Sequence, residues 1–413
     1  MNKDFYINNR KKITDKLEDN SLLLLFSGTA PHKSADAYYD FIVNKNFFYL
    51  VGAEREKFAL LIEKKKGKVK ENLFIDKVTE LEEKWTGFRM TEDEAKEISG
   101  IENVKPIDSL TEYLNSTLFN GEFSNFYLDL ERQRWDFDNT KALSLAKDIR
   151  DRYPHIKINN AYSILVKSRM IKTEEEIEMI KKAIDITNEG IKMIMENSQP
   201  GMMEYQLESY FDFEIKRLGA KRHAFNTIAA SGKNAIVLHY LENNCEMQDG
   251  DLILFDLGAE YNNYCADISR TFPVNGKFTE RQKELYNIVL KSQLETINAV
   301  KPGLPYKELN KVTKKVLIEE CKKIGLIKDD DEISKYYYHG VSHYLGLDTH
   351  DVGERDVNLE PGMVLTIEPG LYIEEEGIGI RIEDNVVVTP DGCINLSIDI
   401  IKTVEEIEAF MNK

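Results

Sequence analysis

The sequence predicts a two-domain protein, with an α/β domain first and a mixed α+β domain, duplicated internally, second. Three observations support this fold class. The chain has 413 residues, more than one ordinary core accommodates. Residues 1–165 alternate short apolar runs with helical stretches. Residues 170–413 contain the same order of helices, Pro-Gly breaks and acid-bearing strands twice.

In residues 1–165, apolar runs bounded by turn residues are interpreted as strands: Ser21–Gly28, Phe47–Gly52 and Phe58–Glu63. The basic run Lys64–Lys70 contains one glycine and is interpreted as an exposed turn. Helices are expected at Thr79–Trp85 and Thr91–Ile98. No residues in this domain predict a particular chemistry.

The second domain begins with a helix. Thr173 and Glu176 have the T-x-x-E spacing of a capping box at a helix start. Isoleucines then recur at helical spacing: Ile177, Ile180, Ile184, Ile191 and Ile194. Pro200–Gly201 ends this segment, and a second helix is expected from Glu204 to Leu218, with Gly219 just past its end.

The same pattern recurs further along the chain. Thr279 and Gln282 open another helix, which ends at Pro302–Gly303, and a further helix runs to Gly325. The two Pro-Gly pairs lie 102 residues apart (303 minus 201). Each half then continues into β-rich sequence with two acids: Asp256 and Asp267 in the first, Glu368 and Glu383 in the second. This order predicts an internal duplication of a helix–helix–hairpin unit.

The first pair of acids lies in a predicted hairpin. Two β-like runs flank the pair Asn262–Asn263: Asp251–Tyr261 and Tyr264–Phe272. This turn would place Gly258 opposite Asp267, because 258 plus 267 equals 262 plus 263. Asp256 shares the face of Gly258, so the acids become diagonal neighbours, roughly 7–8 Å apart at the backbone. Like charges this close repel unless a cation lies between them. The alternative is an exposed sheet face with two solvated acids.

The second pair of acids also has strand-like surroundings. Gly379, Arg381 and Glu383 alternate with isoleucines and therefore share one face. Arg381 could orient the neighbouring carboxylate, although a surface ion pair of little energetic value is the alternative. Glu368 ends the apolar run that Pro369–Gly370 breaks, which predicts a strand edge or bulge.

Histidines add to this set of acids. The chain has seven, five of them in the second domain, and four of those five are candidates for the site: His239, His339, His343 and His350. Residues 338–353 contain three of these four and three glycines, which let a backbone approach a metal or substrate closely. Carboxylates with one imidazole suit Mn²⁺, Co²⁺ or Zn²⁺, and four negative charges balance two divalent cations. The sequence therefore predicts a two-metal hydrolase site, with these ligands: Asp256, Asp267, His343, Glu368 and Glu383.

The composition limits which binding partners and which cellular compartment are expected for this chain. The formal net charge of -17 argues against a nucleic-acid surface and against binding to an anionic membrane. The first apolar run, Leu22–Phe26, is too short for a signal sequence or a membrane span. The cysteines are widely spaced and form no C-x-x-C pair, which indicates reduced thiols in a cytoplasmic protein: Cys245, Cys265, Cys321 and Cys393.

The second domain resembles the pita-bread metallopeptidases, which include methionine aminopeptidase, prolidase and aminopeptidase P. The matching segments are LHYLENN, ILFDLGAEYNNYCADISRTFPV, YHGVSHYLGLDTHDVG, TIEPGLYI and GIGIRIEDNVVV. The five expected ligands follow the family order D…D…H…E…E. Residues 33–39 and the segment FFYLVG extend the resemblance to the N-terminal domain, where they are similar to aminopeptidase P.

The resemblance implies hydrolysis of the N-terminal Xaa-Pro bond of peptides by a hydroxide that bridges two divalent ions. Mn²⁺ is the expected ion, with Co²⁺ and Zn²⁺ as alternatives. By similarity, the ligands of the two ions are shared: Asp256, Asp267 and Glu383 hold one, and Asp267, His343, Glu368 and Glu383 hold the other.

The resemblance also implies roles for residues around the ions. Glu368 is expected to carry the proton between the nucleophile and the leaving nitrogen. His239 and His350 are expected to bind substrate and stabilise the tetrahedral oxyanion. His339, Tyr372 and Arg381 match family positions with supporting roles.

The expected partners are peptides with proline at the second position and further copies of this chain, in a dimer or tetramer. One alternative is a prolidase, which would cleave only Xaa-Pro dipeptides because the groove beyond the proline is blocked. Another is a non-catalytic pita-bread binding protein, which would have lost ligands, whereas all five are present. Methionine aminopeptidase is disfavoured because of the large N-terminal domain.

Overall fold

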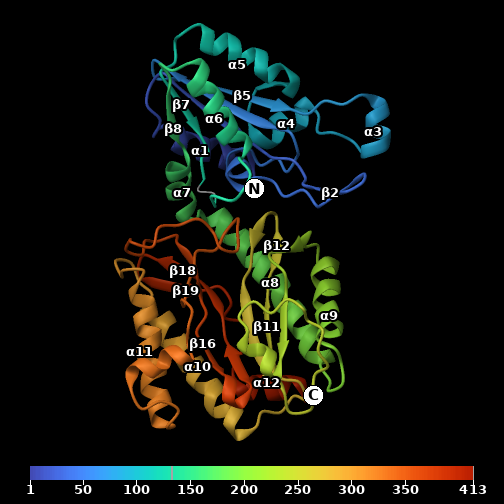
Figure 1. The fold of residues 1–413 in the computed structure, drawn as a ribbon, viewed down its shortest axis with the longest axis vertical. Coiled ribbons are helices and arrows are strands. Elements are labelled where there is room, and N and C mark those ends of the chain that lie inside the picture. The colour runs from blue at the N-terminus through green and yellow to red at the C-terminus, as the bar shows by residue number, and fades with distance from the viewer. Residues whose placement is uncertain (132–133, 413) are drawn as a thin grey trace. The chain divides into compact units, whose positions relative to one another are not determined.

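The computed structural model describes residues 1–131 and 134–412 and divides into two compact units, Met1–Ser168 and Arg169–Lys413 (Figure 1). Both units mix helices with sheet strands. Within the described part of the chain, no helix is long and apolar enough to cross a membrane.

A six-stranded mixed sheet forms the centre of the first unit. Its strands, in spatial order, are β6 (Asn103–Pro106), β5 (Lys68–Ile75), β4 (Ala59–Lys65), β1 (Ser21–Phe26), β7 (Asn125–Leu128) and β8 (Lys157–Asn160). β4 runs antiparallel to both of its neighbours, whereas the other neighbouring pairs are parallel. A separate exposed hairpin joins β2 (His32–Ser34) and β3 (Ala37–Tyr38).

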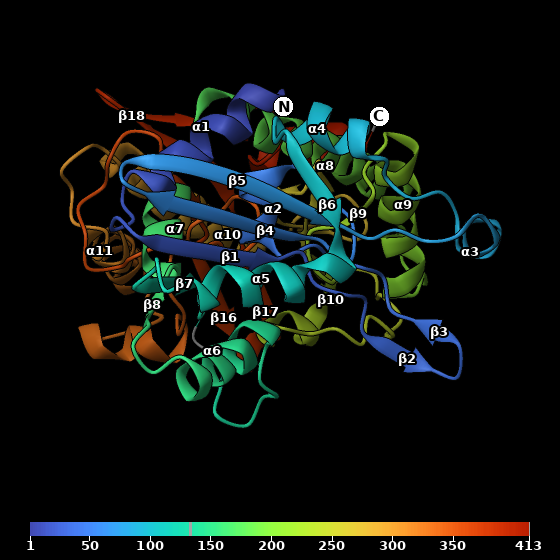
Figure 2. The same ribbon diagram turned by 90° about the horizontal axis from the view of Figure 1, so that it is seen from above.

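Helices accompany this sheet: α1 (Lys3–Thr14), α2 (Lys45–Val51), α3 (Glu80–Thr86), α4 (Glu92–Ser99), α5 (Leu110–Phe119), α6 (Lys141–Arg152) and the start of α7 (Tyr162–Met170). Leu22 and Leu24 of β1 share a buried cluster with Leu114 of α5 and Ile149 of α6. Figure 2 shows α5 and α6 on one side of the strands and α1 and α4 on the other. The apolar faces of the strands are thereby buried.

Two local predictions in this unit are wrong. Phe47–Gly52 was expected to be a strand but lies in α2, because the Asn44 side chain caps the helix start and Gly52 ends it with φ of 78°. A short apolar run does not distinguish a buried strand from a buried helix. Lys64–Lys70 is mostly strand, with the turn confined to Lys66 and Gly67. The expected helices α3 and α4 are confirmed, and each begins with a capping box.

The second unit contains two helix pairs (Figure 1): α8 (Glu174–Asn197) with α9 (Glu204–Arg217), and α10 (Glu280–Ala299) with α11 (Glu308–Lys323); α12 (Val404–Met411) ends the unit. The helices within each pair pack against each other. The predicted capping boxes of Thr173 and Thr279 are both present. These helix boundaries confirm the sequence interpretation.

The strands of this unit are β9 (Arg222–His223), β10 (Ile228–Ser231), β11 (Leu252–Leu257), β12 (Ala259–Tyr261), β13 (Tyr264–Cys265), β14 (Ile268–Pro273), β15 (Val364–Ile367), β16 (Gly370–Ile373), β17 (Ile378–Arg381), β18 (Asp384–Thr389) and β19 (Gly392–Asn395). After each helix pair the pairing is the same. β11 pairs antiparallel with β14, and β15 with β18. Between them, β12–β13 and β16–β17 form shorter hairpins. The predicted duplication is confirmed at the level of topology.

The register of the first hairpin is the predicted one. Asp256 lies opposite Ser269, two residues beyond Asp267, so the two acids are diagonal neighbours. The chain passes very close to itself here, since a Cβ added to Gly258 would lie 1.9 Å from the carbonyl oxygen of Ala266. Glycine is therefore required at this position.

Candidate metal centre

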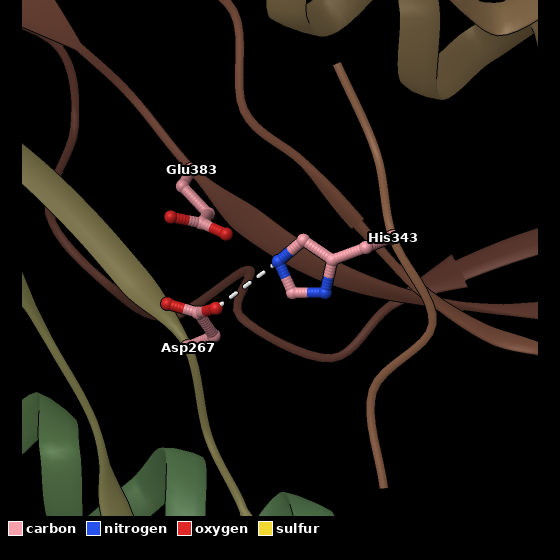
Figure 3. A group of neighbouring side chains, drawn as sticks. All are labelled: Asp267, His343 and Glu383. Atoms are coloured by element: carbon pink, nitrogen blue, oxygen red, sulfur yellow. Dashed lines mark ion pairs between the residues drawn. The ribbon is translucent and has the colours of Figure 1, made fainter. Parts of the chain in front are cut away.

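Side chains from both halves of the second unit meet in one cluster. Asp267 precedes β14, His343 lies in the irregular segment 338–353, and Glu383 lies between β17 and β18. One ligand atom of each lies within 4.8 Å of the others. Figure 3 shows the three side chains pointing toward one another, with His343 Nε2 3.3 Å from Asp267 Oδ2.

The other two predicted ligands border this cluster. Glu368 directly follows β15, and its Oε1 lies 3.6 Å from Nε2 of His343. Asp256, on β11, is close enough for its charge to raise the pKa of Asp267. All five predicted ligands therefore lie in one region, although the tightest grouping contains three of them.

The carboxylates of this region destabilise one another's charged forms. Burial raises the pKa of Asp267, and the charges of Asp256 and Glu368 raise it further. Burial, followed by the charge of Asp267, also raises the pKa of Glu383. Burial raises the pKa of Glu368, although His343 acts in the opposite direction. Cations among these groups would favour their ionised forms.

In this region, two buried carboxylate oxygens have no hydrogen-bond partner among the residues that the structure describes, Asp256 Oδ1 and Glu383 Oε1. The second oxygen of each acid is occupied: Asp256 Oδ2 accepts from Arg381 at 2.6 Å, and Glu383 Oε2 from Ser269 at 2.7 Å. An unpaired buried acceptor costs about 1–3 kcal/mol. A divalent cation would satisfy both oxygens, so the residues fit a metal site.

His343 has the tautomer that a metal ligand needs. Its Nδ1 lies 2.9 Å from the backbone oxygen of Tyr344, which can only accept, so Nδ1 carries the proton. The lone pair of Nε2 then faces Asp267 and Glu368. Metal-binding histidines usually donate their second N–H to a carbonyl or carboxylate in this way.

His339, Tyr372 and Arg381 form a hydrogen-bonded row beside the acids. Nδ1 of His339 donates to the Gly340 carbonyl at 2.7 Å, so its Nε2 accepts from the Tyr372 hydroxyl at 2.8 Å. That hydroxyl accepts in turn from Arg381 at 3.1 Å. Burial lowers the pKa of His339 to about 4 and raises the pKa of Tyr372 to about 12. Both side chains are therefore neutral at neutral pH.

The remaining two histidines complete the surroundings. The rings of His343 and His350 lie edge to face, with centroids 4.4 Å apart. Burial lowers the pKa of His350, and the charges of His343 and His239 lower it further. His239 is exposed. It is thus the solvent-facing member of the group of histidines around the acids.

Three further residues contact the site but were not predicted as site residues from the sequence: Ser269, Thr366 and Asn385. Thr366 accepts from the backbone N–H of His343 at 3.0 Å, and the Asn385 amide donates to the backbone oxygen of Asp267 at 2.7 Å. Strand parity could have found all three, because each lies two residues from a predicted ligand: Ser269 from Asp267, Thr366 from Glu368, and Asn385 from Glu383.

Family models match both units. The model of metallopeptidase family M24 matches residues 178–390, and that of the aminopeptidase P N-terminal domain matches residues 6–127. The Xaa-Pro aminopeptidase of Escherichia coli (strain K12) is 37% identical, and the alignment covers 97% of this chain and 96% of that protein.

Two solved structures are similar to this chain over its whole length. A chain from Bacillus anthracis is 52% identical, with a TM-score of 0.98, and the match covers 100% of this chain and 99% of that one. Aminopeptidase P from E. coli with the inhibitor Pro-Leu is 34% identical, with a TM-score of 0.92, and the match covers 100% and 98%.

Proposed function

The chain belongs to metallopeptidase family M24, and on that premise we propose that it is a metal-dependent aminopeptidase that hydrolyses the N-terminal Xaa-Pro bond of peptides. The observation that carries this proposal is the cluster of the buried Asp267 and Glu383 with the half-buried His343, bordered by Glu368 and Asp256. The full-length similarity to an Xaa-Pro aminopeptidase supports the choice of substrate.

Five residues would hold two divalent ions: Asp256, Asp267 and Glu383 the first, and Asp267, His343, Glu368 and Glu383 the second. The unpartnered oxygens of Asp256 and Glu383 support this assignment. When bound, such ions make water acidic enough to act as a nucleophile at neutral pH and polarise the scissile carbonyl. We propose Mn²⁺, with Co²⁺ and Zn²⁺ as alternatives, because the donors are mostly carboxylates with one imidazole.

Glu368 is the proposed proton carrier. Burial raises its pKa, and its carboxylate lies beside His343 at the edge of the cluster. A carboxylate in this position can accept a proton during attack and return it to the leaving proline nitrogen. Proline specificity also relies on recognition of a bond whose nitrogen has no hydrogen.

His239 and His350 are the proposed substrate-binding groups. An imidazole N–H can donate to the carbonyl oxygen on which negative charge develops, which stabilises the transition state more than the ground state. The neutral His339 is oriented by Tyr372, which is held by Arg381. His339 and Tyr372 therefore support the site as neutral hydrogen-bonding groups.

We also propose that the domains correspond to residues 1–165 and 170–413, and that the enzyme is a dimer or tetramer. We propose a cytoplasmic location, because the four cysteines are widely spaced and form no C-x-x-C pair. The proposed partners are peptides, and neither nucleic acid nor membrane is expected for a chain of net charge -17.

Cleavage of Arg-Pro-Pro, Arg-Ala-Ala and Ala-Pro by the Mn²⁺-loaded protein tests this function. We expect release of arginine from Arg-Pro-Pro and no release from Arg-Ala-Ala, which has the same first residue without the proline. Turnover of Ala-Pro alone would indicate a prolidase and contradict the aminopeptidase proposal. No turnover of any of the three would contradict the enzymatic proposal as a whole.

A further inference from the structure

Ser269 connects the two acids that have unpartnered oxygens. It lies fully buried on β14, opposite Asp256. Its Oγ accepts from Nε of Arg381 at 2.8 Å and donates to Oε2 of Glu383 at 2.7 Å. Because the guanidinium can only donate, the single hydroxyl proton must point to Glu383. The hydroxyl therefore has one determined orientation.

Arg381 and Ser269 each occupy one oxygen of one acid. Nη2 of Arg381 donates to Asp256 Oδ2 at 2.6 Å, and Ser269 donates to Glu383 Oε2. The second oxygen of each acid has no hydrogen-bond partner within residues 1–131 and 134–412. Asp256, from the first half of the duplication, and Glu383, from the second, are thus held through one shared pair of side chains.

We propose that Ser269 is a positioning residue of the metal centre. By linking Arg381 to Glu383, its hydroxyl leaves one oxygen of Glu383 and one of Asp256 for the ions. This inference rests on the proposed function as a metallopeptidase. Ser269 does not need to touch substrate or metal, because both of its hydrogen bonds go to residues of the protein.

A backbone hydrogen bond of Ser269 allows the positioning role of its hydroxyl to be tested separately from a role in folding. Its backbone oxygen accepts from the N–H of Glu383 at 3.0 Å, and that bond does not involve the hydroxyl. A Ser269→Ala variant therefore keeps β14 attached to the segment of Glu383. It removes only the hydrogen bonds that orient the Glu383 carboxylate and the Arg381 guanidinium. An ordinary buried serine would affect stability and leave metal affinity unchanged.

Titration of the metal-free protein with Mn²⁺, followed by calorimetry, tests the proposal. We expect Ser269→Ala to weaken Mn²⁺ binding by about 10–100-fold, as for other residues that orient metal ligands. Circular dichroism should show that the metal-free variant stays folded. Ser269→Thr keeps the hydroxyl and should restore most of the affinity.

Ser292→Ala is the matched control. Ser292 is equally buried, on α10, and its hydroxyl donates to the Thr313 carbonyl at 3.2 Å, away from the proposed ligands. Its loss should leave Mn²⁺ affinity unchanged. If Ser269→Ala does not fold, Ser269→Cys, with a weaker donor, is titrated instead.

Tight binding by the wild type together with unchanged binding by Ser269→Ala would overturn this inference and leave the proposed function in place. Equal losses in Ser269→Ala and Ser292→Ala would also overturn it, because they would indicate a general packing effect. A wild-type protein that binds no Mn²⁺ would overturn the proposed function and this inference with it.

Discussion

Asp256 and Glu383 each accept a hydrogen bond through one carboxylate oxygen, and the other oxygen has no partner in the described part of the chain. His343 likewise gives Nδ1 to a backbone carbonyl and keeps Nε2 for the cluster. Each of these three proposed ligands is therefore held through one atom and available to a metal through another. The site therefore depends on how these side chains are oriented as much as on residue type. Without these hydrogen bonds, the same acids could rotate away from the cluster.

Replacement of His343 by alanine should weaken Mn²⁺ binding and Arg-Pro-Pro cleavage by more than about 100-fold, because loss of a supporting residue alone costs 10–100-fold. His343 is partly exposed and its loss should leave the fold intact. His155→Ala is the control, since His155 is exposed and lies in the first unit. Activity in His343→Ala within a few-fold of wild type would contradict the assigned ligand set.

Residue identity and strand-like surroundings were sufficient to select the four acids, because acids are unusual inside strands, whereas the choice of His343 among the histidines relied on the family resemblance. The contacts of Ser269 could not be predicted in this way. Its bond to Glu383 joins residues 114 positions apart. A serine in a strand is ordinary, and only the packing of the two halves shows which acid it meets.

At the scale of elements, the hairpin of β11 to β14 sets the spacing of the first two acids. Asn262 and Asn263 both have positive φ, 49° and 66°, which suits the tight turn that fixes the register. A shift of the strand pairing by one residue would place Asp256 and Asp267 on opposite faces of the sheet. The turn could be predicted from its residues, whereas the helix at Phe47 could not, because its apolar run has no clear period.

Gly258→Ala should destabilise the protein by about 3 kcal/mol, since its Cβ would meet the Ala266 carbonyl oxygen and neither backbone can yield without breaking the register. Urea denaturation of the second unit measures this change. Gly392→Ala is the control, because the nearest atom to a Cβ there is 4.0 Å away and Gly392 also lies in a strand. Equal stability of the two variants would contradict the close approach at Gly258.

At the scale of the whole molecule, ion pairs within the second unit connect its first residues to the histidine segment. Asp351 accepts from Arg169 at 2.5 Å and from Lys172 at 2.8 Å, and all three are buried. Burial alone would raise the pKa of Asp351, but the two cations lower it below its ordinary value. Asp351 directly follows His350, so this contact also fixes part of the proposed site.

Asp351→Asn should destabilise the protein by about 3–5 kcal/mol at neutral pH, because it removes the carboxylate from the buried Lys172 and one of the carboxylates that pair with the buried Arg169. The folded pKa of Asp351 lies below its unfolded value of about 3.9. The stabilisation is therefore fully present above that pH and is lost as pH falls through the folded pKa. Thermal unfolding between neutral pH and pH about 3 should show the difference between wild type and variant shrinking in acid. A difference independent of pH would contradict the ion-pair explanation.

We propose that the two repeated halves of the second unit bring acids to a shared dinuclear centre. Titration of Mn²⁺ into the metal-free protein while Arg-Pro-Pro cleavage is measured tests this most directly. We expect no cleavage without metal and a rise to a plateau at two equivalents of Mn²⁺. Full cleavage in the presence of a chelator, or a plateau at one equivalent, would contradict it.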